Sequence, residues 1–323
     1  MLENKSSPKT LILLDGNALM HRAYHGLNKH FVPVLDGEPV GMVYGFASTL
    51  LNAINYFQPD LLVVTFDTKE KTFRHEMDHE YKAHRVAAPD DFYAQIPRVF
   101  ALLESFELPV LKAPGFESDD LIGTLTLQAV DRNFDVKILS GDLDFTQLVS
   151  DRVKLVKLNG KIEAAPVYGP EEVESRYGLK PEQMVDFKAI VGDSSDNYAG
   201  VPGIGPKTAE KLLQQFGTLQ NVWQQIESVE PASLQKKLLQ HKDQVEHCQS
   251  LAGIHTDVPV EFDWEAAFHF AEEKTDAFFE KMKFHSLRNR YQKLIKKYDQ
   301  KKNSVPKKSS GKPSPEEQMS LFG

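Results

Sequence analysis

Three short apolar runs along the chain each end in an aspartate. The runs cover residues 10–15, 61–67 and 136–142 and end in Asp15, Asp67 and Asp142. Apolar runs of this length are typical of buried parallel strands, and in open α/β sheets the ligand site lies beyond the carboxyl ends of the strands. We therefore expect these three side chains to meet at one edge of a sheet.

Six further acids are crowded into short runs of their own. These acids are Glu117, Asp119, Asp120, Asp144, Asp193 and Asp196. Like charges held close together raise one another's pKa and lower stability unless cations neutralise them. The alternative is that 117–120 caps a helix and 142–144 is a surface turn, because acids in a first helical turn are routine.

Nine carboxylates at one sheet edge would favour hard, oxygen-seeking cations, Mg²⁺ or Mn²⁺. No Cys or His cluster with zinc spacing accompanies them, which argues against zinc. Two such ions held roughly 3.5–4 Å apart can activate a water and stabilise the departing oxygen of a phosphoryl displacement. Phosphodiester hydrolysis is therefore the leading chemistry.

The segment 69–85, directly after Asp67, mixes basic and aromatic side chains. Arg74, Tyr81, Lys82 and Arg85 could share one broad face if this segment were a helix. Cations for phosphates and a ring for a base are the parts of a channel for single-stranded nucleic acid. The alternative is a solvated loop whose charge only balances nearby acids.

A glycine-rich turn precedes an amphipathic helix at about 206–216. Its candidate binding residues are Gly203, Gly205, Lys207, Thr208 and Lys211. Pro206 separates Gly205 from Lys207, so the ending of a Walker loop is absent, which argues against ATP binding. A turn of this kind can instead bring backbone N–H groups and a helix N-terminus to a DNA phosphate. Such a contact recognises the DNA backbone and not the base sequence.

Strand and helix patterns alternate in the first half, which predicts a largely parallel sheet with helices on both faces. Helices are expected at 43–57, 90–106 (interrupted by Pro97) and 118–132, and then at 170–177, 181–191, 206–216, 218–227, 232–250 and 275–298. We expect a core at 1–169, a mostly helical part at 170–299, and a disordered basic tail at 300–323, because the tail has too few apolar residues to order itself.

Charge is distributed unevenly along the chain. The net charge is −8, which alone would argue against a polyanionic partner. Residues 288–312, however, hold ten Lys/Arg and one acid, so the other 298 residues carry 28 basic and 45 acidic side chains, or −17. The positive charge is thus concentrated at 69–85, around Lys207 and Lys211, and at 288–312.

No apolar run could span a bilayer, and one cysteine with no signal-like N-terminus predicts a cytoplasmic protein without membrane contact.

Taken together, these motifs closely resemble the 5′ nuclease domain family of bacterial DNA polymerase I, within the flap endonuclease superfamily. The resemblance runs from about residue 11 to 291 and rests on LLDGNALMHRAYH, VYGFASTLL, TFDTKEKTFRHEMDHEYKAHR, GFESDDLIGTL, LSGDLDFTQLV and VGDSSDNYAGVPGIGPKTAEKLL. It implies a PIN-like α/β core with a helical arch at about 69–90 and a helix–three-turn–helix at about 186–216. It also implies a 5′–3′ exonuclease and flap endonuclease that leaves 5′-phosphates.

The resemblance also implies roles for particular residues. All nine acids fall on the family's metal positions, for two Mg²⁺ or Mn²⁺ ions. Arg74, Lys82 and Arg85 match catalytic arch positions, with Lys82 near the scissile phosphate, and Tyr81 matches a DNA-binding position. The turn at Gly203 and Gly205 matches the duplex anchor, which often holds K⁺ on backbone carbonyls. Two positions depart from the family: Leu143 stands where many relatives carry Lys, and Ala199 replaces a common Pro.

No polymerase or proofreading module follows residue 291, which predicts a free-standing, monomeric nuclease. The last residues, with Gln318, Leu321 and Phe322, resemble the bacterial sliding-clamp-binding peptide. A peptide of this kind can fold when it binds. The alternative is a terminus with no partner.

We therefore expect a metal-dependent, structure-specific 5′ nuclease acting on flap and RNA-primed DNA in primer removal and repair. Two alternatives stay open. A PIN-type ribonuclease would share the acidic core, and a DNA-junction-binding protein would need little catalysis.

Overall fold

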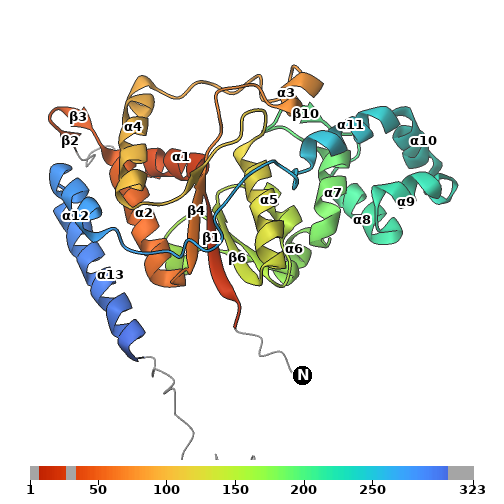
Figure 1. Cartoon of the computed structure of the whole chain (residues 1–323). Coiled ribbons are helices and arrows are strands. Elements are labelled where there is room, and N and C mark those ends of the chain that lie inside the picture. The colour runs from red at the N-terminus through yellow and green to blue at the C-terminus, as the bar shows by residue number, and fades with distance from the viewer. Residues whose placement is uncertain (1–6, 27–33, 305–323) are drawn as a thin grey trace, which may run out of the picture.

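The protein is described by a computed structural model, which places residues 7–26 and 34–304, with side chains described to residue 300. Its centre is a six-stranded sheet in the order β5-β4-β1-β6-β7-β8 (Figure 1). The strands are β1 Lys9–Asp15, β4 Leu61–Thr65, β5 Val110–Leu111, β6 Phe134–Ser140, β7 Val153–Lys157 and β8 Val167–Tyr168. All neighbours pair in parallel except β7 and β8, so the expected largely parallel sheet is confirmed.

Helices cover both faces of this sheet, because successive side chains of each strand point to opposite sides. Leu11 and Leu13 of β1 belong to one core, and Ile12 and Leu14 belong to the other. The first half supplies α1 Gly16–Gly26, α2 Gly41–Phe57, α3 Phe73–Met77, α4 Asp90–Ser105 and α5 Ser118–Asp131. Helix α4 continues through Pro97 instead of breaking there.

The chain after β8 is mostly helical, as predicted. Its helices are α6 Pro170–Tyr177, α7 Met184–Val191, α8 Pro206–Phe216, α9 Leu219–Gln224, α10 Ala232–Gln240, α11 Lys242–Ala252, α12 Glu272–Lys281 and α13 His285–Ser304. Two expected helices are each divided: 232–250 breaks at His241, and 275–298 breaks before His285, where Lys283 adopts a left-handed backbone with φ of 57°. Since β8 ends at Tyr168, we propose a boundary near residue 170 between the two parts.

Helices α12 and α13 return to the first half of the chain. Phe279, Leu287 and Tyr291 join the core formed by α2 and α4, whereas α6–α11 belong to the other side of the molecule (Figure 1). Helix α13 also continues past residue 300, where the tail was expected to begin. Within the described residues, no helix is long and apolar enough to cross a membrane.

The smaller elements lie in the connections. They are the hairpins β2 Val34–Leu35 with β3 Glu38–Pro39 and β9 Gly192–Asp193 with β10 Tyr198–Ala199, and the short 3₁₀ helices η2 Asp144–Leu148, η3 Ile162–Ala164, η4 Pro181–Gln183 and η5 Ile226–Ser228. Hairpin β9–β10 and helix η2 carry acids of the site described next.

Candidate metal centre and nucleic-acid interface

A cavity of about 390 Å³ opens at the carboxyl edge of the sheet. Asp15 is the last residue of β1, and Asp67 and Asp142 follow the neighbouring strands β4 and β6. All three line the cavity, together with Glu117 and Asp119 from the start of α5. The parallel strands therefore bring together acids that lie up to 127 residues apart in the chain.

Neutral donors hold these carboxylates in place. Ser140 Oγ donates to Asp15 Oδ2 at 2.6 Å, and Asn17 Nδ2 donates to Asp67 Oδ2 at 2.6 Å. The backbone N–H of Ser118 adds a bond of 2.8 Å to Asp67 Oδ1, which fixes α5 against the end of β4. The sequence analysis did not single out Asn17 or Ser140, which have no charge to mark them.

The crowding of these acids changes their protonation. Burial, with the charges of Asp67 and Asp142 added, raises the pKa of Asp15 to about 6. Burial and the charges of Asp15 and Asp142 raise the pKa of Asp119 well above its usual range. Buried carboxylates that repel one another and have only oxygen ligands to offer suit a hard divalent cation, which would displace their protons.

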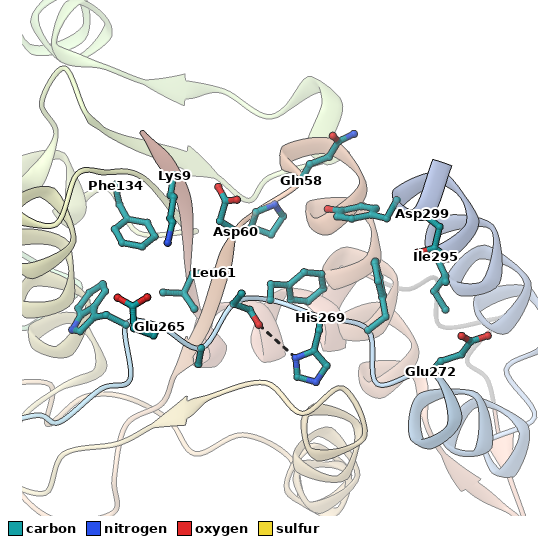
Figure 2. Close-up of a pocket in the computed structure, with 17 residues that line it drawn as sticks. Lys9, Gln58, Asp60, Leu61, Phe134, Glu265, His269, Glu272, Ile295 and Asp299 are labelled. Carbon is teal, nitrogen blue, oxygen red and sulfur yellow. Dashed lines mark hydrogen bonds between the residues drawn. The ribbon is translucent and has the colours of Figure 1, made fainter. Parts of the chain in front are cut away.

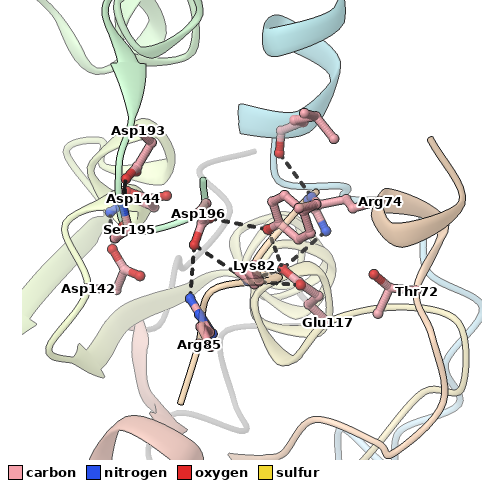
Figure 3. A network of polar contacts seen from close by, with 12 residues as sticks. Thr72, Arg74, Lys82, Arg85, Glu117, Asp142, Asp144, Asp193, Ser195 and Asp196 are labelled. Atoms are coloured by element: carbon pink, nitrogen blue, oxygen red, sulfur yellow. Dashed lines mark hydrogen bonds and ion pairs between the residues drawn. The ribbon is translucent and has the colours of Figure 1, made fainter. Parts of the chain in front are cut away.

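A second acidic cluster adjoins the cavity (Figure 3). Carboxylate oxygens of Asp144, Asp193 and Asp196 all lie within 4.8 Å of one another. The ammonium of Lys188 pairs with Asp144 and lies 2.5 Å from Asp193 Oδ2. Burial and the charge of Asp142 raise the pKa of Asp144 to about 7, whereas bonds from Lys188 and Ser195 outweigh the effect of burial and lower the pKa of Asp193 to about 2.

Lys188 is a residue that the sequence analysis missed. It lies on α7, five positions before Asp193, and its ammonium stands between two acids that a divalent ion could use. The only signal in the sequence was a lysine on the helix that leads into the acidic turn, which did not distinguish it from other lysines.

The end of the basic segment closes over both acid groups (Figure 3). Lys82 Nζ lies 2.8 and 2.9 Å from the carboxylate oxygens of Glu117 and 3.9 Å from Asp196 Oδ1. Arg85 Nη2 donates to Asp196 Oδ1 at 2.9 Å, and its side chain is 55% exposed. Burial disfavours the Lys82 ammonium, but the Glu117 and Asp196 charges outweigh it and raise its pKa.

The segment is not one continuous helix, so Arg74, Tyr81, Lys82 and Arg85 do not share one helical face. Helix α3 ends at Met77, and Lys82 has a left-handed backbone with φ of 56° whose N–H donates to Asp196 O at 3.0 Å. The ring of Tyr81 is also not open to a base, because the residue is 3% exposed and its OH donates to Glu117 and Asp196. The acids below the segment bind its polar groups and so fix its path.

Arg74, for which a catalytic role was expected, does not line the cavity, although its Nη1 lies 3.4 Å from Oε2 of Glu117, which does. Its Nη1 and Nη2 each donate to one carboxylate oxygen of Asp120 at 2.8 Å, and the residue is 2% exposed. Nε and Nη2 also donate to the carbonyls of Leu251 and Gly253 at 3.0 and 2.6 Å. The guanidinium therefore ties the start of the basic segment to α5 and to the end of α11.

Asp120 is likewise separate from the other acids. It is fully buried, and besides Arg74 it accepts from the backbone N–H groups of Glu117 at 3.0 Å and His255 at 2.9 Å. With both oxygens bonded in this way, Asp120 is not placed to ligate an ion in the cavity, so eight of the nine acids remain as candidate ligands.

The glycine turn directly precedes α8. Gly203 has φ of 75°, a conformation that favours glycine, and Gly205 caps α8 with its carbonyl. Lys207 and Lys211 are exposed, and Thr208 is half-buried. The turn thus leads into a helix N-terminus with exposed cations nearby, and its role in binding DNA stays a prediction.

The two departures from the family occupy ordinary positions. Leu143 precedes η2 and packs against the core, so it has no polar role there. The carbonyl of Ala199 accepts from Gln244 Nε2 at 2.7 Å, which holds the β9–β10 hairpin against α11.

A larger hollow, of about 530 Å³, lies at the opposite edge of the sheet (Figure 2). It is lined by Lys9, Leu61 and Phe134, the first residues of β1, β4 and β6. Ligands of open α/β sheets bind at carboxyl ends, and the convergent acids are there too, so we assign the chemistry to the smaller cavity.

A cavity lined by converging acids under basic side chains has the chemistry that suits divalent cations and an anionic substrate. Comparison with known proteins gives the same class. Residues 10–178 match the N-terminal resolvase-like domain of 5′-3′ exonucleases, and residues 179–276 match their C-terminal SAM fold. The chain belongs to the 5′-3′ exonuclease family, which confirms the resemblance.

Individual relatives agree with this family assignment. DNA polymerase I of Thermus filiformis is 39% identical over 289 residues, covering 89% of this chain and 34% of that protein. The chain thus spans about a third of the length of this relative. Among solved structures, a bacteriophage T5 flap endonuclease complex with DNA and metal ions matches with TM-score 0.63 and 20% identity over 89% of this chain and 98% of that one. Human GEN1 with Holliday junction DNA matches with TM-score 0.59 and 15% identity, over 93% and 75%.

Proposed function

We propose that this chain is a divalent-metal-dependent, structure-specific 5′ nuclease that hydrolyses phosphodiesters of flap and RNA-primed DNA in primer removal and repair. One observation carries the proposal: eight acids from separate segments converge beneath Lys82 and Arg85 at the carboxyl edge of the sheet. The products would carry 5′-phosphates, and both 5′–3′ exonuclease and flap endonuclease activities are included.

The acids divide into two groups that would hold two ions, Mg²⁺ or Mn²⁺. One group is Asp15, Asp67, Glu117, Asp119 and Asp142, and the other is Asp144, Asp193 and Asp196. Such ions lower the pKa of a coordinated water and stabilise charge on a leaving oxygen. Ser140 and Asn17 orient the first group, and the protons held by Asp15 and Asp119 would leave as an ion binds.

The basic side chains would bind the phosphate. Lys82 and Arg85 now neutralise Glu117 and Asp196, and ions on those acids would free both cations for the scissile phosphate. Lys207, Lys211 and the N–H groups at the start of α8 would bind the duplex backbone. A K⁺ ion on the turn stays a prediction, and it would compete with Lys237 Nζ, which lies 3.4 Å from Gly203 O.

The experiment is cleavage of labelled 5′-flap DNA with Mg²⁺, beside matched overhang, RNA-primed and single-stranded RNA substrates. We expect cleavage of the DNA junctions, no cleavage in EDTA, and none with Asp142→Ala, which should still bind duplex DNA. Cleavage of RNA alone would favour the ribonuclease alternative, and junction binding without cleavage would favour a binding protein.

Clamp binding through Gln318, Leu321 and Phe322 also stays a prediction, because these residues lie outside the described part of the chain. The monomeric state and the cytoplasmic location also stay predictions.

A further inference from the structure

The larger hollow, of about 530 Å³, takes no part in the proposed nuclease reaction (Figure 2). We call it the amino-edge hollow, because it lies where β1, β4 and β6 begin, at the opposite end of the strands from the acidic cavity. Its other walls are the segment 264–270, between α11 and α12, and the last turns of α13. It is therefore a separate surface whose use has to be inferred from its own side chains.

Aromatic side chains form much of this surface. They are Phe134, Trp264, Phe268, Phe270 and Tyr298. The rings of Phe270 and Tyr298 pack edge to face with their centroids 4.9 Å apart, and Phe268 lies 5.2 and 6.4 Å from these two centroids. All except Phe134 are only half-buried. Rings that stay partly open in this way can hold an apolar group or a cation.

The chain's own cations already lie over two of these rings. Lys9 Nζ lies over Phe134, 5.8 Å from the ring centroid, and the Arg132 guanidinium lies over Trp264 at 4.9 Å. A cation above an aromatic face is attracted by the charge distribution of the ring. In the described part of the chain, no Lys or Arg lies over the cluster around Tyr298. That cluster can therefore accept a cation from elsewhere.

Acidic side chains surround the rings (Figure 2). They are Asp60, Glu265, Glu272 and Asp299, and all four are exposed. None forms an ion pair with a side chain of the described residues. Lys9 is the one lysine that lines the hollow, so four acids and one lysine give a formal charge of −3. His269 also lines it, but its Nε2 pairs with Glu107 Oε2 at 2.9 Å. The hollow thus combines open rings with unpaired negative charge, which suits a basic, partly apolar segment.

A basic segment of the same chain begins close to the hollow. Three residues of α13, the last of them Asp299, line the hollow, and the helix ends at Ser304. The segment 305–312, which lies outside the described residues, holds three lysines and no acid. Five helical residues rise about 7.5 Å, and four extended residues span up to about 13 Å. Lys307 and Lys308 are therefore near enough in the chain to return to the hollow.

We propose that the amino-edge hollow binds the basic segment 305–312 of its own chain, with Lys307 and Lys308 between the unpaired acids and the open rings. Charge complementarity supports this occupant, because three lysines would meet a surface of formal charge −3. The inference does not depend on the nuclease reaction. A docked segment would start residues 313–323, which hold the predicted clamp-binding peptide, from the edge of the sheet opposite the acids.

The test is amide hydrogen exchange, measured by mass spectrometry on the full chain and on a chain that ends at Ser304. Residues 264–270 lie in no helix or strand, so their amides report directly whether another segment covers them. We expect them to exchange about threefold faster in the shortened chain, as for a tethered contact of millimolar strength. Equal exchange in the two chains would overturn the proposal.

Charge reversal separates docking from an effect of chain length. In the full chain, Lys307→Glu/Lys308→Glu should speed exchange at 264–270 as much as the deletion does. The charge-matched control is Lys236→Glu/Lys281→Glu, because both lysines are exposed and neither lines the hollow. The control should leave exchange at 264–270 unchanged. An equal effect from the two variants would reduce the contact to net charge and so contradict the proposal.

An exchange of charges across the contact tests the partners themselves. Adding Glu265→Lys/Asp299→Lys to Lys307→Glu/Lys308→Glu should restore the slow exchange, because each side then carries the other's charge. Continued fast exchange would exclude these partners. Protection that rises with protein concentration would assign the hollow to the basic segment of a second copy, and would equally overturn docking within one chain.

Discussion

Asp119 and Asp120 are neighbours in the chain but have opposite environments. Asp119 lines the acidic cavity, and burial and neighbouring acids raise its pKa. Asp120 is paired through both oxygens with Arg74 and accepts two backbone N–H groups. The α-helix sends consecutive side chains about 100° apart, so one acid serves the cavity and the next serves the fold.

The basic segment shows the same division. Arg74, near its start, makes its shortest bonds to Asp120 and to two carbonyls and lies 3.4 Å from one oxygen of Glu117, whereas Lys82 and Arg85, near its end, face the acids of the site. We call Arg74 with Asp120 the anchor. Lys82 and Arg85 belong with the acids around the cavity. In this chain, a charged group whose hydrogen bonds are all satisfied stabilises the fold. A charged group that lies among others of the same sign is available for chemistry.

The largest effect is expected from Asp119→Asn. Removing this carboxylate should lower flap cleavage by more than about 10³-fold, a barrier increase of about 4 kcal/mol. The melting temperature in EDTA should not fall, because the substitution relieves repulsion in the cavity. Single-turnover cleavage and thermal denaturation on one preparation measure both. A matching loss of stability would place Asp119 in the anchor instead.

Arg74→Ala should chiefly change stability. It leaves the Asp120 carboxylate buried without its cation, which costs about 3–5 kcal/mol. Urea denaturation measures the free energy of unfolding. The control is Arg85→Ala, whose half-exposed ion pair should contribute no more than about 1 kcal/mol. Equal losses from the two variants would remove the distinction between anchor and cavity.

Lys82→Ala should reduce the rate of cleavage by about 10²-fold, as expected when one cation is removed from a developing charge. The effect should fall on kcat more than on KM, and Lys82→Arg should restore part of it. A change in KM alone would make Lys82 a substrate-binding residue with no role in the chemical step.

A smaller effect concerns pH. Folded Asp15 and Asp144 have pKa values of about 6 and 7 against an ordinary 3.8, so between pH 4 and 7 the folded state binds more protons than the unfolded state. Stability in EDTA should therefore decrease as pH rises through this window. Asp193, with a pKa of about 2, changes the stability only below this pH window. Mg²⁺ should raise the melting temperature by several degrees more at pH 8 than at pH 5. An equal rise in melting temperature at both pH values would exclude competition between Mg²⁺ and the protons on these carboxylates.

Much of the site could be predicted because it follows from local pattern. Apolar runs that end in aspartate predicted parallel strands, and the shared carboxyl edge of those strands then predicted the meeting of Asp15, Asp67 and Asp142. The motifs also identified the family. Each of these inferences rests on patterns within short segments and on the general geometry of a sheet.

The anchor could not be predicted in this way. Arg74 and Lys82 lie in one basic segment, and only contacts with Asp120, Leu251 and Gly253 separate their roles. The last two lie more than 170 residues away in the chain. The packing of α13 against α2 has the same origin, since contacts such as those of Arg290 with Ser48 and Asn52 join residues that lie most of the sequence apart.

The most direct test of the central claim is anomalous diffraction from crystals of the protein grown with Mn²⁺. The account predicts manganese peaks among Asp15, Asp67, Glu117, Asp119 and Asp142 and among Asp144, Asp193 and Asp196, with none at Asp120. A peak bonded to Asp120, or no peak at the carboxyl edge of the sheet, would contradict it.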